Sequence, residues 1–126
     1  MVANDRQVGG AHYGGTDYQH WDWVNDCRMP YLAGVGSKYI ARAYASGKSV
    51  QDLEKAVHYA EKCCEVNPAV LPVVDRMAYF WRFAITNKLR PEQAAICWYF
   101  MEGEWEAAKA ACVTALEATR KAQQPA

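Results

Sequence analysis

The chain has 126 residues, of which 52% are hydrophobic and 22% are charged. This composition excludes an intrinsically disordered chain and predicts one globular domain over residues 1–126. The 14 basic and 14 acidic side chains give no formal net charge, which argues against binding of duplex nucleic acid, because such binding depends on an excess of cations.

The first 18 residues are rich in glycine and turn-forming residues and contain no apolar run, which predicts a loop and no secretory signal peptide. The longest apolar stretch, 94–101, is too short to cross a membrane. Five cysteines without CxxC spacing favour reduced core thiols over a disulfide framework or a metal site: Cys27, Cys63, Cys64, Cys97 and Cys112. We therefore expect a soluble, cytoplasmic protein with no metal and no membrane partner.

Three helices are expected in the first half of the chain. The first covers about 19–27, and the second covers about 31–45 and ends at Gly47, which supplies a left-handed stop. The third begins with Ser49 as N-cap, and Asp52 three residues later completes a Ser-x-x-Asp capping box.

Three further helices are expected over 72–86, 91–101 and 104–121, and no strand pattern competes with them. The fold class is therefore all-α, a compact bundle of about five to six helices with a glycine-rich N-terminal loop. The first two of these helices are apolar on nearly every side, which is more than one small core covers, so the C-terminal helices (68–122) predict a homo-oligomer. Their aromatic residues are of the type found in interface cores: Trp81, Trp98, Tyr99 and Phe100.

A candidate anion site begins with Lys38 and Arg42, which lie one turn apart on one face of the second helix. Gly34 and Gly36 share that helix, where each glycine costs about 1 kcal/mol relative to alanine. We interpret this cost as a sign that another backbone or a ligand approaches the helix closely.

The third helix adds Asp52, Lys55 and Tyr59 on the face away from its apolar stripe. Asp52 is as well explained by capping as by ligand binding, whereas Tyr59 is a large ring on a polar face, which indicates stacking. Tyr39 and Trp21 are candidates for base stacking, although packing is favoured for Trp21. Cations, a carboxylate and rings together suit an anionic, ring-bearing small molecule such as a nucleotide.

About residues 5–64 resemble a small family of phage-encoded proteins that are described either as nucleotide kinases or as a domain of unknown function. The matching positions comprise a His-Tyr pair, a tryptophan and two helical motifs: His12, Tyr13, Trp21, Gly34, Lys38, Tyr39, Arg42, Asp52, Leu53, Lys55, Ala56 and Tyr59. The resemblance implies a nucleotide ligand, held by the charged and polar members of this set, and a location in the infected host cell. Val35 stands where the family has Asn.

We favour sequestration of a nucleotide, or of a nucleotide-derived immune signal, without catalysis. The reason is that Val35 lacks the family's amide and that Asp52 is the carboxylate nearest the motif. The alternative is a non-P-loop nucleoside monophosphate kinase, which would use ATP and Mg²⁺. A third hypothesis is a helical module that binds a host protein through the helices over 72–86 and 91–101.

Overall fold

The computed structural model describes residues 17–125, and within them the chain forms six helices and no strand. The all-α bundle expected from the sequence is therefore confirmed. The helices are α1 (His20–Asp26), α2 (Tyr31–Arg42), α3 (Ser49–Val66), α4 (Arg76–Thr86), α5 (Pro91–Glu102) and α6 (Trp105–Ala122). Within the described part of the chain, no helix is both long and apolar enough to cross a membrane.

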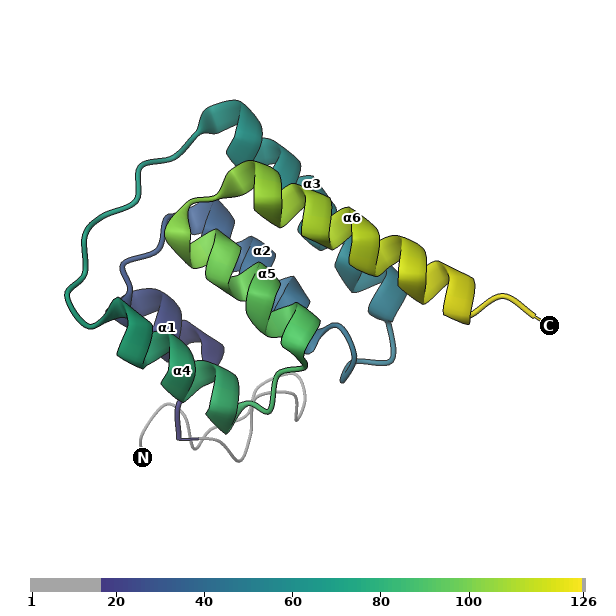
Figure 1. The fold of residues 1–126 in the computed structure, drawn as a ribbon, viewed down its shortest axis with the longest axis horizontal. Helices are drawn as coiled ribbons and strands as arrows, with labels where there is room; N and C mark the ends of the chain where they lie inside the picture. Colours follow the sequence, from purple (N-terminus) through teal and green to yellow (C-terminus); the bar gives the residue numbers. More distant parts are fainter. Residues whose placement is uncertain (1–16, 126) are drawn as a thin grey trace.

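The helices are arranged as three pairs, α1 with α4, α2 with α5, and α3 with α6 (Figure 1). Helices α2, α3, α6 and α5 form a closed ring in which each contacts the next, as in a four-helix bundle. The pair α1 and α4 covers the outer side of α2 and α5, with the Trp23 ring stacked on Phe83 at 4.6 Å between centroids. The long connection 67–75 links α3 to α4 around the end of the bundle (Figure 1).

One of the two predicted glycine stops is confirmed by backbone geometry, and the other is wrong. Gly103 is the C-cap of α5 with φ of +75°, the left-handed region that stops a helix at low cost for glycine. Gly47 also has a positive φ, +76°, but α2 already ends at Arg42 with Ala43 as its C-cap, so Gly47 lies in the turn before α3 and does not stop α2. Helix α4 begins at Arg76 instead of Pro72. Residues 72–75 are not helical, and Asp75 occupies the N-cap position.

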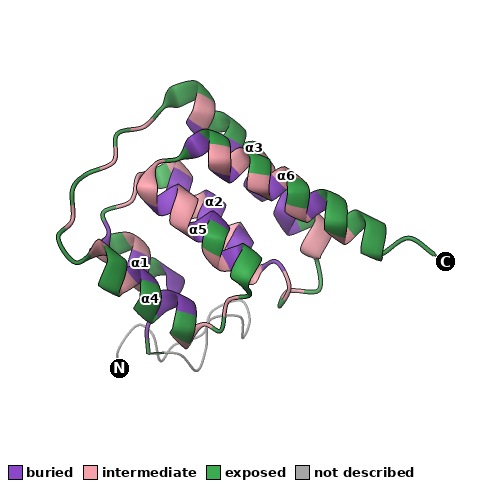
Figure 2. Cartoon of the chain, viewed as in Figure 1, coloured by how far each residue is buried: buried purple, intermediate pink, exposed green. Residues whose placement is uncertain are grey.

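The apolar surface of α5 is covered within the chain itself. Its residues Ile96, Cys97, Phe100 and Met101 are all buried between α2 and α6. The excess of apolar residues over 91–101 is thus explained by a central position in the bundle (Figure 2). Helix α4 instead keeps three large apolar side chains exposed, Met77, Trp81 and Ile85.

Candidate functional site

Three cationic side chains converge on the ring of Tyr39 where α2 packs against α3. The Nζ atoms of Lys38 and Lys55 each lie 5.1 Å from the centre of this ring, and the Arg42 guanidinium carbon lies 5.8 Å from it. The ring of Tyr59 stacks on Tyr39 with 6.0 Å between centroids. We call these five residues the Tyr39 cluster.

The cluster forms because α2 and α3 approach each other closely at Gly36. A Cβ atom at this position would lie 3.2 Å from Cβ of Tyr59 and 2.7 Å from Cζ of Phe100. At Gly34, a Cβ atom would lie 3.1 Å from Cγ1 of Val24. The prediction of close approach is confirmed, but the approaching groups are packed side chains and not a backbone or a ligand.

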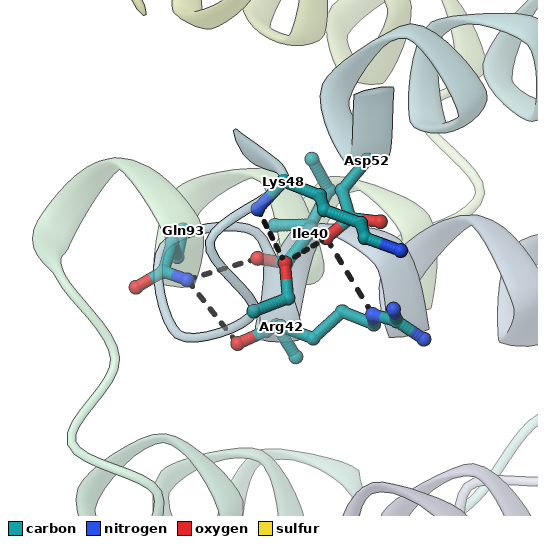
Figure 3. Close-up of polar contacts among 7 residues, drawn as sticks. Ile40, Arg42, Lys48, Asp52 and Gln93 are labelled. Atoms are coloured by element: carbon teal, nitrogen blue, oxygen red, sulfur yellow. Dashed lines mark hydrogen bonds and ion pairs between the residues drawn. The ribbon is translucent and has the colours of Figure 1, made fainter. Parts of the chain in front are cut away.

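Asp52 is not placed where the sequence suggested. It is 1% exposed and so does not lie on the polar face of α3. Ser46 Oγ donates a hydrogen bond of 2.6 Å to its Oδ2, and the same oxygen lies 3.5 Å from Nε of Arg42 (Figure 3). The capping box is also wrong, because Lys48 occupies the N-cap position and Ser49 is already the first helical residue.

The contact with Asp52 orients Arg42 through one side of its guanidinium group. The ion pair ends at Nε, so the two terminal nitrogens lie outside this contact (Figure 3). Gln93 of α5 holds the same end of α2 in place, because its Nε2 donates to the carbonyl oxygens of Ile40 at 2.9 Å and Ala41 at 3.3 Å. The position of Arg42 is therefore fixed by two neighbouring elements.

The Tyr39 cluster carries an excess of positive charge. Three cations are balanced by one carboxylate, Asp52, which leaves two positive charges. Three other basic residues in the described part of the chain pair with carboxylates: Lys62 with Glu65, Arg76 with Glu102 and Arg120 with Glu54. Lys38 and Lys55 form no such ion pair within residues 17–125, and their contact is with the Tyr39 ring.

Beside the cluster lies a buried His20 that sequence reasoning missed. Its Nε2 lies 2.9 Å from Ser37 Oγ, and that hydroxyl donates to the carbonyl oxygen of Gly34 at 3.0 Å. Burial, together with the charge of Lys38, lowers the pKa of His20 to about 4, so the imidazole is neutral at physiological pH. Ser37 is 0% exposed, and its hydroxyl proton is used by a carbonyl, so this pair stabilises the fold and does not form a nucleophile.

The remaining predicted residues are placed as follows. Trp21 lies on α1 with 54% of its surface exposed. His12 and Tyr13 lie outside the described residues. His58 of α3 is exposed, and its ring lies 6.5 Å from that of Tyr59 between centroids, in an edge contact.

The cysteines are reduced, as expected, and four of the five are buried. Burial raises the pKa of Cys27 and Cys63 to about 11 and that of Cys112 to about 12, so these thiols are protonated and unreactive. Among residues 17–125, no three His, Cys, Asp or Glu side chains come together as a metal site would require.

Comparisons with protein-family models, with curated proteins and with solved structures give no match to this chain.

Proposed function

We propose that the protein binds an anionic, ring-bearing small molecule, most simply a nucleotide, at the Tyr39 cluster and releases it chemically unchanged. The observation that carries this proposal is the convergence of three cations on one tyrosine ring with a single carboxylate among them. Mutual repulsion of these cations is relieved when an anion binds between them. The resemblance to phage proteins extends the proposal to sequestration of a nucleotide-derived immune signal.

Different side chains of the Tyr39 cluster suit the phosphate and the base of the ligand. Lys38, Lys55 and the terminal nitrogens of Arg42 suit phosphate oxygens, because charge-assisted hydrogen bonds are the strong ones. The two lysines contact the Tyr39 ring, and their flexible stems would let them move to an anion. The ring face that they leave suits stacking by a base.

Binding without catalysis is supported by the position of Asp52. Phosphoryl transfer needs a group that orients the nucleophile and oxygen ligands for Mg²⁺. Asp52 is 1% exposed and already bonded to Ser46 and paired with Arg42. The other carboxylate near the motif, Asp22, accepts the backbone N–H of Gln19 at 2.8 Å in the capping box of α1.

The proposal is tested by calorimetry with Lys55→Ala and with Lys62→Ala as the matched control. Lys62 lies seven residues farther along the same helix, so both lysines lie on one face of α3, but Lys62 pairs with Glu65 at 3.1 Å. We expect Lys55→Ala to weaken nucleotide binding by about 1.5–3 kcal/mol and Lys62→Ala to leave it unchanged. Equal effects of the two substitutions would show that the cluster is an ordinary solvated face.

A second experiment separates binding from the kinase alternative. The protein is incubated with each nucleoside monophosphate, ATP and Mg²⁺, and the nucleotides are analysed by chromatography after denaturation. We expect the ligand to be recovered intact at a fixed ratio to the protein. Multiple turnovers that yield a diphosphate, and that are abolished by Lys38→Ala, would establish the kinase instead.

A further inference from the structure

Helix α4 exposes a continuous line of apolar side chains. Met77 is 59% exposed, Trp81 is 52% exposed and Ile85 is 71% exposed, and Val74, in the turn just before the helix, is fully exposed. Ala78 is also exposed and completes the line. At the helical repeat, Met77, Ala78, Trp81 and Ile85 fall in an arc of about 100°. We call these four residues, together with Val74, the α4 stripe.

The opposite face of α4 packs against other helices of the same chain. Phe83 stacks on Trp23 of α1, and Phe80 contacts the edge of Trp98 of α5 at 5.1 Å between ring centroids. The exposed residues of α4 therefore lie along the outer edge of the molecule (Figure 2). The α4 stripe exposes on the order of 500 Å² of apolar surface, which is at the upper end of the exposed apolar patches found on monomeric proteins. This area is also more than half of the surface that each partner buries in an interface of standard size.

We propose that the α4 stripe pairs with the same stripe of a second copy of this chain, with the two helices antiparallel. An interface with two-fold symmetry must be complementary to itself, and four of the five apolar positions, all except Met77, meet this condition. Antiparallel pairing that is centred between Tyr79 and Phe80 brings Ala78 against the partner's Trp81, so the smallest residue of the stripe meets the largest. The same pairing brings Val74 against the partner's Ile85.

The charges at the two ends of α4 favour the same arrangement. Asp75 is exposed at the start of the helix, and Lys88 is exposed just beyond its end. Antiparallel pairing places each Asp75 near the end of the partner helix that carries the partner's Lys88, whereas parallel pairing would place like charges together. The macrodipoles of the two helices also oppose each other favourably in this orientation.

The proposed pairing is independent of the proposed function. The α4 stripe lies on the outer side of the α1 and α4 pair, whereas the Tyr39 cluster lies between α2 and α3. Each protomer thus keeps its own complete cluster, and failure of one proposal leaves the other standing.

The test is sedimentation equilibrium over a range of micromolar concentrations. We expect the wild type to have twice the 14.2 kDa chain mass. Ile85→Glu should raise the dissociation constant of the dimer by roughly tenfold or more, because a charge would be buried in the interface. The matched control is Tyr31→Glu, which replaces another exposed ring, 76% exposed on α2, and should leave the dimer intact.

The orientation is tested by charge pairing across the interface. Val74→Lys alone should also weaken the dimer, whereas the double variant Val74→Lys with Ile85→Glu should restore it, because opposite charges then meet at both ends of an antiparallel pair. Circular dichroism checks that each variant keeps its helices. A monomeric wild type, a dimer that tolerates Ile85→Glu, or a double variant that stays as weak as the single ones would overturn the proposal.

Discussion

Gly36→Ala tests whether the glycines of α2 serve packing. The added methyl group would lie 2.7 Å from Phe100 Cζ, and Phe100 is 0% exposed in the centre of the bundle. The ring therefore has no space into which to move. Alanine gains about 1 kcal/mol in helix propensity, but overpacking of a full core costs about 1–3 kcal/mol. We expect a net loss of about 1 kcal/mol in the free energy of unfolding.

The matched control for this prediction is Gly34→Ala on the same helix. Its Cβ would lie 3.1 Å from Cγ1 of Val24, which is only half-buried and can shift by a few tenths of an ångström. Most of the propensity gain should remain, so Gly34→Ala should be neutral or stabilising by up to about 1 kcal/mol. Both free energies come from urea unfolding followed by circular dichroism, with equal slopes as the check on comparability. If the two variants were equally stable, the packing explanation for Gly36 would be wrong.

Three further predictions concern buried polar groups and thiols. The pKa of His20 is lowered to about 4 in the folded protein, so between about pH 6.5 and pH 4 the unfolded chain binds a proton that the folded chain does not. The free energy of unfolding should therefore fall by about 3 kcal/mol as the pH decreases over this range. His20→Gln should lack this part of the acid sensitivity, and a variant with the same pH profile as the wild type would contradict the prediction. Gln93→Ala leaves the carbonyl oxygens of Ile40 and Ala41 without their donor and should cost about 1–3 kcal/mol in urea unfolding, whereas Gln51→Ala at an exposed position of α3 should cost nothing measurable. In the native protein, Cys64 should react first with a thiol reagent, because it is half-buried and the other four cysteines are buried; mass spectrometry that finds another cysteine labelled as fast would refute this.

The helices and most of their ends could be predicted from the sequence because the signals are local. Gly103 is the C-cap of α5 with the positive φ that was expected, whereas α2 ends at Arg42, before Gly47. The first turn predicted for α4, 72–75, is not helical. The prediction failed there because the periodicity of the sequence does not reveal that Asp75 takes the N-cap position.

The positions of the site residues could likewise be predicted only where local sequence, and not tertiary contact, determines them. Lys38 and Arg42 share a face because of helical spacing, and α3 follows α2 directly, so the approach of Lys55 could be anticipated. The burial of Asp52 could not, because it depends on how the turn before α3 directs Ser46 Oγ toward it. The contact of His20 with Ser37 joins residues of different helices, and no local pattern predicts it.

The Tyr39 cluster would bind the two parts of a nucleotide by different side chains, and one calorimetric comparison examines this. The wild-type protein is titrated separately with a nucleoside, with inorganic phosphate and with the corresponding nucleoside monophosphate. Because the cations would hold the phosphate and the Tyr39 ring would hold the base, the nucleotide should bind more tightly than either part, by about tenfold or more for a stacking contribution of about 1–3 kcal/mol. Equal affinity for nucleotide and inorganic phosphate, or no binding of any of the three, would contradict nucleotide recognition at this cluster.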